Sequence, residues 1–360
     1  MTAAPSMFES APFAWDRAAK EPWLAAQLAE LTRHHRDRCP AYRHMLDGLG
    51  FELRPDARVA DFPFLPVRLF KEMDLRSVPA DAVFKTMTSS GTTGQARSVI
   101  ALDRETAGNQ QKALVKIVAD FIGPRRLPML ILDCPSVVKD RALFSARGAG
   151  ILGFSIFGTE RLYALDDDMR LDVAGIREFL ARHAGEPVLL FGFTFMVWKH
   201  FYRELARLEA PLDLSRGVLV HGGGWKKLAG EAVTPREFKA RLAEACGLAR
   251  VHDYYGMVEQ TGSIFMECER GHLHASVFSD VIPRRAIDFA PCAVGELGIL
   301  EVVSLLPRSY PGHCLLTEDE GRLLGEDDCP CGRKGKYFQV LGRLASAEIR
   351  GCSDTYAVPS

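Results

Sequence analysis

The chain has 360 residues, of which 47% are hydrophobic and 25% are charged, and its formal net charge is −1. This is the composition of an ordinary globular protein with enough apolar residues for a full core. A near-zero net charge provides no long-range field that would attract nucleic acid or an anionic membrane, so we expect neither as a partner.

Features that direct a chain to or across a membrane are not found in the sequence. No apolar run approaches the ~20 residues that span a bilayer, and the segment from Met1 to Trp15 lacks the pattern of a signal peptide. Nine cysteines at irregular spacing argue against a disulfide scaffold. A reducing cytoplasm is the simplest setting, in which clustered cysteines indicate metal binding or chemistry.

Predicted helices and strands alternate over the first part of the chain. Leu24, Leu28 and Leu31 share one face of a helix predicted for residues 24–35. Apolar runs predict buried strands at 127–132, 150–157, 188–193 and 217–220, and amphipathic segments predict helices at 173–183 and 235–245. This alternation predicts an α/β architecture.

Beyond Glu267 the pattern changes to short strand candidates separated by turns. Residues 298–303 and 337–341 predict strands, and Gly, Pro, Cys and acidic residues lie between them. We therefore predict an α/β body over residues 1–266, a β-rich subdomain over 267–345 and a C-terminal tail over 346–360.

A run of small and hydroxyl residues is the first motif with a chemical meaning. It reads Thr88-Ser89-Ser90-Gly91-Thr92-Thr93-Gly94. Small residues let the backbone approach a phosphate closely, and hydroxyl and N–H groups donate to it. The Gly-Lys-Ser/Thr ending of a Walker loop is missing. A flexible turn is the structural alternative, and we favour phosphate binding.

A second glycine-rich turn follows the strand predicted at 217–220. It reads His221-Gly222-Gly223-Gly224-Trp225-Lys226-Lys227. Open α/β sheets bind ligands at the carboxyl ends of their strands, where this turn lies. Lys226 and Lys227 either meet phosphate or carboxylate or are solvated charges at a helix start, and both alternatives stay open.

Three shorter motifs contain the remaining candidates. In Tyr254-Tyr255-Gly256-Met257-Val258-Glu259, an aromatic ring can stack on a base, Gly256 allows a turn, and Glu259 can bind Mg²⁺. Asp319 in Thr317-Glu318-Asp319 can accept from ribose hydroxyls, and Arg343 after Gly342 can bind ribose or phosphate. Taken singly, each is better explained by a surface charge.

In this order, the motifs resemble the adenylate-forming superfamily of ATP-dependent, AMP-forming enzymes that activate carboxylic acids. The resemblance implies an acyl-CoA synthetase-like N-terminal domain with a β-rich subdomain, and a phosphate loop at Ser89 to Gly94. It also implies adenine stacking on Tyr255, an Mg²⁺ ligand at Glu259, ribose binding by Asp319 and a nucleotide contact from Arg343.

A closer resemblance is to the acyl-protein synthetase of the bacterial-luminescence fatty-acid reductase complex, a family related to phenylacetate–CoA ligases. The stretches that carry it are Leu65 to Lys71, Ser145 to Gly150, Phe191 to Phe195, and His221 to Lys227. Arg350-Gly351-Cys352 resembles the segment with the acyl-accepting cysteine. That family forms acyl-AMP from a fatty acid, moves the acyl group to its own cysteine and passes it to a reductase.

The sequence departs from the superfamily pattern in two places. Ala96 and Arg97 replace a Pro and a Lys that often follow the phosphate loop. The chain ends at Ser360, so we expect the mobile C-terminal domain with its catalytic lysine to be missing or vestigial. Either Lys226 or Lys227 then substitutes for that lysine, or adenylation relies on Mg²⁺ and backbone donors.

Cys268, His274, Cys329 and Cys331 form a set of metal-ligand type in the β-rich part. Four thiolate and imidazole ligands make a closed, structural Zn²⁺ site, an arrangement that the resemblance to phenylacetate–CoA ligases also implies. His272 competes with His274 for the fourth position, and a set of unrelated buried thiols is the alternative. The remaining cysteines before the tail are expected to be structural: Cys39, Cys134, Cys246, Cys292 and Cys314.

The leading hypothesis is an enzyme that activates a carboxylic acid of the fatty-acid type as acyl-AMP. It then transfers the acyl group to Cys352 and from there to an acyl-CoA-reductase-like partner. A thiolate is the required nucleophile, and a polar tail can carry it between two sites. An AMP-forming carboxylate–CoA ligase and a non-catalytic nucleotide-binding scaffold are the alternatives. A set of apolar residues fits a fatty or an aryl pocket, or the core: Phe191, Phe193, Phe195, Met196 and Trp198.

Overall fold

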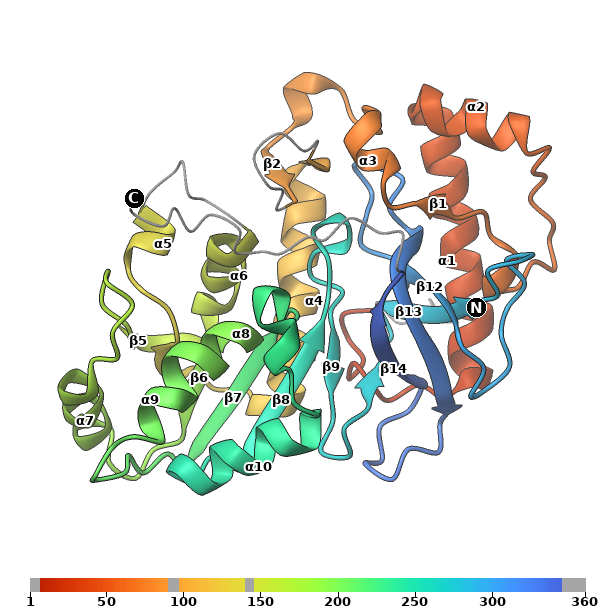
Figure 1. Ribbon diagram of the computed structural model, residues 1–360. Coiled ribbons are helices and arrows are strands. Elements are labelled where there is room, and N and C mark those ends of the chain that lie inside the picture. Colours follow the sequence, from red (N-terminus) through yellow and green to blue (C-terminus); the bar gives the residue numbers. More distant parts are fainter. Residues whose placement is uncertain (1–6, 90–96, 140–145, 345–360) are drawn as a thin grey trace. The chain divides into compact units, whose positions relative to one another are not determined.

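The structure is a computed structural model that describes residues 7–89, 97–139 and 146–344 (Figure 1). These residues form two compact units. Unit 1 contains residues 7–89, 97–120 and 256–344, and unit 2 contains residues 121–139 and 146–255. The units interleave along the chain, whereas the domains expected from the sequence follow it in order, and those domain boundaries stay a prediction.

Unit 2 is built on a parallel sheet with the strand order β8-β7-β6-β4-β5. Its strands are β4 (Leu127–Ile131), β5 (Gly158–Tyr163), β6 (Val188–Phe193), β7 (Gly217–Gly222) and β8 (Arg250–Tyr255). Its helices include α5 (Ser136–Lys139), α6 (Ala146–Phe154), α7 (Val173–Arg182), α8 (Thr194–Met196), a π-helical segment (Val197–Tyr202), α9 (Arg203–Leu205) and α10 (Pro235–Cys246). The strand order reverses between β4 and β6, where open α/β sheets usually bind their ligands.

The strand predicted for residues 150–157 is wrong. These residues belong to α6 and to a 3₁₀ turn that spans Ser155–Phe157. A continuous apolar run does not distinguish a buried strand from a buried helix, because neither period is visible in it. In the fold, α6 lies against β6, and the ring of Phe154 stacks on that of Phe191 with 4.2 Å between centroids. The other predicted strands and helices of this part are confirmed.

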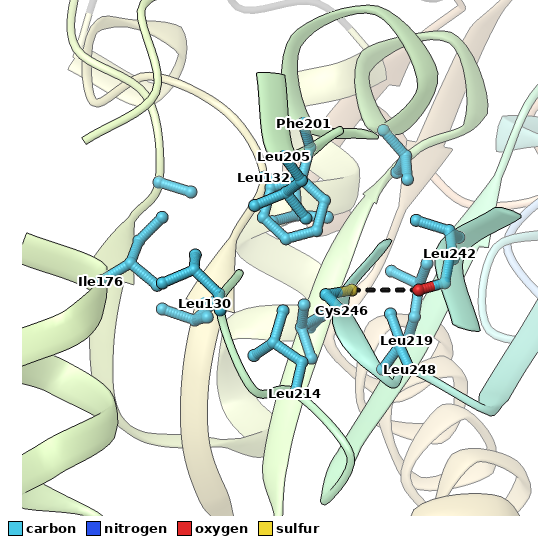
Figure 2. Packing of buried hydrophobic residues seen from close by; sticks show 14 of the residues in the cluster. Leu130, Leu132, Ile176, Phe201, Leu205, Leu214, Leu219, Leu242, Cys246 and Leu248 are labelled. Carbon is cyan, nitrogen blue, oxygen red and sulfur yellow. Dashed lines mark hydrogen bonds between the residues drawn. The ribbon is translucent and has the colours of Figure 1, made fainter. Parts of the chain in front are cut away.

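The hydrophobic core of unit 2 lies between the sheet and the helices α7 and α10 (Figure 1). Leu130 of β4, Leu219 of β7 and Phe201 of the π-helical segment are buried members of this core (Figure 2). Full burial of one such side chain contributes roughly 1.5–3 kcal/mol. Figure 2 also shows the Cys246 thiol, which donates to the Leu242 carbonyl at 3.2 Å. Cys246 is therefore structural, as expected.

The ends of α10 follow from local chemistry. The Thr234 hydroxyl accepts a hydrogen bond from the Glu237 N–H at 3.2 Å, and Pro235 occupies the first helical position. Gly247 ends the helix with a φ of 75°, a conformation that costs glycine little. The predicted helix at 235–245 is confirmed, with one further residue at its C-terminal end.

Unit 1 contains a mainly antiparallel sheet with the strand order β11-β12-β13-β14-β10-β9, and β1 pairs with β13 in parallel. These strands are β1 (Leu65–Pro66), β9 (Phe265–Glu267), β10 (Leu273–His274), β11 (Ser279–Arg284), β12 (Gly298–Ser304), β13 (Cys314–Glu326) and β14 (Lys336–Arg343). A separate hairpin joins β2 (Lys85–Thr88) to β3 (Val99–Leu102). The strands predicted at 298–303 and 337–341 are confirmed.

The helices of unit 1 are α1 (Arg17–Arg38), α2 (Pro40–Gly48), α3 (Leu69–Glu72) and α4 (Arg104–Ile122), the last two residues of which belong to unit 2. Leu24, Leu28 and Leu31 of α1 are all buried. They pack with Ile282 of β11 and Val303 of β12. The amphipathic helix is therefore confirmed and begins seven residues earlier than its apolar periodicity indicates, because the Asp16 side chain caps its first turn. Across the described ranges, no helix is both long and apolar enough to span a bilayer.

A buried polar network joins α1, α2 and the β12–β13 connection. The Nε2 atom of His313 lies 3.1 Å from the Thr32 hydroxyl and 3.3 Å from the Tyr42 hydroxyl. The His313 ring stacks on that of His35 with 5.1 Å between centroids. Burial lowers the pKa of His313 to about 3. The folded protein therefore keeps this imidazole neutral across the physiological range.

We predict that His313 makes the fold sensitive to acid. Its pKa is lower in the folded state than in the unfolded chain, so its contribution to stability is complete above pH ~6.5 and is lost as the pH falls toward 3. Between pH 7 and pH 5, one such group costs about 2 kcal/mol of unfolding free energy. Urea unfolding at the two pH values measures this loss. His313→Gln should lose less stability on acidification than wild type.

A variant of the exposed residue His44 is the matched control. His44→Gln should lose as much stability between pH 7 and pH 5 as wild type does. An equal loss in the His313 and His44 variants would show that His313 does not cause the acid sensitivity.

Candidate functional site

In unit 2, close packing explains the glycine turn after β7. A Cβ atom on Gly222 would lie 2.5 Å from a ring carbon of Tyr254, which is closer than any real contact. Gly223 has a φ of 78°, in the left-handed region that favours glycine. A Cβ atom on Gly224 would meet nothing within 4 Å. Gly222 and Gly223 are therefore required by the local structure, and Gly224 is not.

Hydrogen bonds of Thr194 with His221 and Gly222 stabilise this turn. The Thr194 hydroxyl lies 3.3 Å from the Gly222 carbonyl and donates to it, and the same oxygen lies 2.9 Å from Nδ1 of His221. Because the single hydroxyl proton goes to Gly222, Nδ1 of His221 carries a proton and donates to Thr194. Burial lowers the pKa of His221 to about 3, so the imidazole is neutral.

A buried ion pair occupies the point where the strand order of unit 2 reverses. Nε of Arg147, in the first turn of α6, lies 3.1 Å from Oδ2 of Asp133, which follows β4. Both side chains are buried. This pair is not among the residues predicted from the sequence, although Asp133 directly follows a predicted strand and Arg147 lies in a stretch that resembles the family. A buried pair of charges at a ligand-binding edge is a candidate for substrate binding.

Most of the candidate acyl-pocket residues lie in the core of unit 2. Phe191 and Phe193 are buried in an aromatic cluster with Phe154 and Tyr254. Trp198 stacks on Phe238 of α10 at 5.8 Å and belongs to the core on the opposite face of the sheet. Met196 is also buried, and Phe195 is partly exposed. The cluster around Phe191, which faces α6, is thus the part that remains a candidate for an acyl pocket.

In unit 1, Glu259 lies in a single 3₁₀ turn, Val258–Gln260, and its side chain is buried. Burial raises the pKa of its carboxyl group, and the Glu318 carboxylate adds to this effect. The Ser98 hydroxyl and the Arg343 guanidinium oppose it. A divalent cation beside two carboxylates would favour the ionised form, so the surroundings of Glu259 suit an Mg²⁺ ligand.

Asp319 and Arg343 lie opposite each other on neighbouring strands. They are register partners in the β13–β14 ladder, and Nε of Arg343 lies 3.4 Å from Oδ1 of Asp319. The backbone N–H of Asp319 donates to the Thr317 hydroxyl at 3.1 Å. The positive charge of Arg343 also lowers the pKa of the Glu259 carboxyl group. The structure therefore brings together three motifs that the sequence separates.

Several predicted site residues lie outside the described ranges or at their edges. Ser90, Gly91, Thr92, Thr93, Gly94 and Cys352 are outside them, as are the side chains of Lys226 and Lys227. Ser89 is described, and its hydroxyl accepts from the Ser98 N–H at 2.9 Å, which extends the β2–β3 hairpin by one pair. Tyr255 ends unit 2 and Gly256 begins unit 1.

A second cluster in unit 1 contains the predicted metal ligands. One ligand atom from each of Cys268, His274, Cys329 and Cys331 lies within 4.8 Å of all the others. Nε2 of His274 lies 3.4 Å from the Cys331 sulfur, and burial lowers the pKa of His274 to about 4, which leaves the imidazole neutral. His272 contacts the cluster from its edge, with Nδ1 3.3 Å from the Cys329 sulfur. The structure thus brings together residues up to 63 positions apart in sequence.

Comparison with known proteins assigns the chain to a family. The profile described as acyl-protein synthetase, LuxE, matches residues 3–358. The chain belongs to the acyl-protein synthetase family. Both the family and the enzyme class that the sequence predicts, an ATP-dependent acid-activating ligase, are confirmed.

Two relatives and one solved structure illustrate the similarity. The chain is 22% identical over 365 residues to the long-chain-fatty-acid–luciferin-component ligase of Vibrio harveyi, with 96% of this chain and 90% of the relative covered. The ligase of that name from Aliivibrio fischeri is 23% identical over 368 residues, with 96% and 91% covered. A 2-hydroxyisobutyryl-CoA ligase in an open conformation has a similar fold, with a TM-score of 0.69, 18% identity, and 96% of this chain and 80% of that one covered. The α/β, adenylate-forming fold class is therefore confirmed.

We predict that the glycines of the β7 turn differ sharply in their tolerance of alanine. Gly222→Ala should lower the unfolding free energy by about 1–3 kcal/mol, because the added methyl group overlaps the Tyr254 ring. Gly224→Ala should change it by less than about 1 kcal/mol, because the space is open and the backbone needs no left-handed conformation. Chemical denaturation of both variants measures the difference. Equal stability of the two would contradict the packing argument.

Proposed function

We propose that this acyl-protein synthetase family member uses ATP and Mg²⁺ to convert a long-chain fatty acid into acyl-AMP, and then transfers the acyl group to Cys352. From Cys352 the acyl group passes to a partner reductase. Two relatives named as long-chain-fatty-acid–luciferin-component ligases support the substrate class. The match of the family to residues 3–358 supports the acyl-protein chemistry.

The convergence of Glu259, Asp319 and Arg343 in unit 1 is the observation that carries the proposal. Their motifs are short and separated by 60 and 24 residues in sequence. Nevertheless, the Arg343 side chain forms an ion pair with Asp319, and its positive charge lowers the pKa of the Glu259 carboxyl group. An acidic residue for a metal, an acceptor for ribose hydroxyls and a guanidinium for ribose or phosphate are the groups that a bound ATP requires.

The first half-reaction joins the acid to the nucleotide. A carboxylate oxygen of the acid attacks the α-phosphorus of ATP, the bond from this phosphorus to the bridging oxygen breaks, and pyrophosphate leaves. Glu259 would hold Mg²⁺, which supplies charge neutralisation to the phosphates when it is bound. Arg343, in its ion pair with Asp319, would orient the ribose or the α-phosphate.

The second half-reaction moves the acyl group to a thiol. The Cys352 thiolate attacks the acyl carbonyl carbon, a thioester forms, and AMP leaves with the electrons of the broken C–O bond. In the alternative, CoA is the acceptor and Cys352 is dispensable. The similarity in fold to 2-hydroxyisobutyryl-CoA ligase is the reason to test this alternative.

We predict that activation and transfer separate in a Cys352 variant. Cys352→Ser should retain fatty-acid-dependent ATP–pyrophosphate exchange, because adenylation does not use the thiol. It should lose hydroxylamine-sensitive labelling by radioactive fatty acid, because no thioester forms. Cys292→Ser is the matched control, since Cys292 is a partly exposed free cysteine outside the Cys/His cluster. It should behave as wild type in both assays.

Three outcomes would contradict this assignment. Labelling that persists in Cys352→Ser would show that another nucleophile accepts the acyl group. A wild-type protein that is never labelled but forms acyl-CoA would support the CoA ligase. A wild-type protein without exchange activity on fatty or aryl acids would support a non-catalytic scaffold.

We further propose that Cys268, His274, Cys329 and Cys331 bind one structural Zn²⁺. Three thiols and one imidazole, with their ligand atoms within 4.8 Å, match the tetrahedral N/S set that Zn²⁺ prefers. Four protein ligands leave no open position for a substrate, so the ion would stabilise the β9–β10 turn and the β13–β14 connection rather than take part in catalysis. His272, at hydrogen-bond distance from Cys329, would support that ligand from outside.

We predict about one zinc ion per chain in protein purified without chelator, as measured by elemental analysis. Cys329→Ser should lose the ion and lower the unfolding free energy by more than about 3 kcal/mol, because metal binding and local folding are coupled. Cys292→Ser should keep the ion and its stability. Wild-type protein free of zinc, with unchanged stability in Cys329→Ser, would remove the metal site.

A further inference from the structure

The backbone of Glu259 is held by residues from elsewhere in unit 1. Glu259 lies in a single 3₁₀ turn, which provides few internal hydrogen bonds to fix its carbonyl group. That carbonyl accepts a hydrogen bond from the Tyr310 hydroxyl at 2.8 Å. Tyr310 is fully buried, so no water competes with this hydrogen bond. A buried carbonyl without this donor would be costly.

Two neighbours fix the Tyr310 side chain itself. The Gln110 side chain, on α4, donates to the Tyr310 hydroxyl oxygen from 3.4 Å. The ring of Phe70 meets the Tyr310 ring edge to face, with 5.8 Å between centroids and 88° between planes. Gln110 and Phe70 are both buried. The hydroxyl of Tyr310 therefore has one well-defined position.

The residues next to Glu259 are fixed by the same elements. The Gln260 side-chain amide donates to the carbonyl groups of Val302 and Gly312, at 3.0 and 2.8 Å. Gly262 approaches the backbone of Gln110 so closely that an added Cβ atom would lie 2.3 Å from its carbonyl oxygen. The chain that follows Glu259 is thus held against α4, β12 and the β12–β13 connection.

We propose that Tyr310 is a positioning residue for Glu259, and that it sets the affinity of the site for Mg²⁺ through the Glu259 backbone. This inference rests on the proposed role of Glu259. Tyr310 contacts the carbonyl of Glu259, so it acts through another residue and supplies no ligand atom. Partners of this kind orient metal-ligating groups, and their loss typically costs 10- to 100-fold in metal affinity or activity.

Tyr310→Phe tests the inference, because it removes one hydroxyl and keeps the ring against Phe70. The Kd for Mg²⁺, measured by equilibrium titration in the presence of ATP without fatty acid, should rise by about 10-fold. The Mg²⁺ concentration that half-saturates ATP–pyrophosphate exchange should rise with it, with a smaller change in the rate at saturating Mg²⁺. Tyr42→Phe is the matched control. Tyr42 is an equally buried tyrosine of unit 1 whose hydroxyl lies 3.3 Å from His313. Its Mg²⁺ dependence should equal that of wild type, although its stability also falls.

Glu259→Gln is measured alongside to separate the two claims. If wild type shows no exchange, or if Glu259→Gln keeps the wild-type Mg²⁺ dependence, the proposed role of Glu259 fails and the inference fails with it. If Glu259→Gln is impaired but Tyr310→Phe matches Tyr42→Phe, only the positioning role of Tyr310 is overturned. If Tyr310→Phe does not fold, Gln110→Met replaces it. A rise in the Mg²⁺ requirement of Gln110→Met supports the inference, and an unchanged requirement overturns it.

Discussion

The antiparallel pairing of β13 with β14 is the interaction on which unit 1 depends. One end of this ladder sets Asp319 opposite Arg343, and the other end sets Glu326 opposite Lys336. The connection that follows Glu326 carries Cys329 and Cys331. A single hairpin therefore positions the candidate nucleotide-binding residues and half of the candidate metal ligands. Its register must be correct, because a shift by one residue would turn Asp319 and Arg343 to opposite faces of the sheet.

Buried contacts and irregularities fix this register. The ladder contains two register shifts, near Gly321 and Gly325, where an added Cβ atom would lie 2.4 Å from the Gln339 carbonyl oxygen and from the Tyr337 hydroxyl, respectively. Near the turn end, the Lys336 ammonium lies 2.6 Å from the buried Asp280 carboxylate of β11. Because Asp280 lies on a different strand, this ion pair ties the hairpin to the rest of the sheet. Removing one partner of a buried pair costs far more than the pair contributes, so the contact resists slippage.

The two units position their candidate site residues in different ways. Unit 2 uses the carboxyl edge of a parallel sheet, where Asp133 follows β4 and pairs with Arg147, and where Gly222 and Tyr255 end β7 and β8. Unit 1 uses a cross-strand pair together with a 3₁₀ turn held through Tyr310. The Tyr-Gly-x-x-Glu motif joins these systems in sequence, because the chain leaves unit 2 at Tyr255 and enters unit 1 at Gly256.

The sequence by itself determined the family and the α/β class, and it predicted Glu259, Asp319, Arg343 and the Cys/His set as site residues, because residue type and motif order are local information. Most of the helices and strands that it predicted are confirmed, since an amphipathic period indicates a helix and a short apolar run indicates a buried strand. Only the tertiary structure decided that residues 150–157 are helical, because a uniformly apolar run has no period. Likewise, the Asp133–Arg147 pair and the hydrogen bond of Tyr310 to Glu259 join residues that are 14 and 51 positions apart. Such contacts depend on strand register and on which polar groups burial forces to pair, and neither is encoded in any one segment.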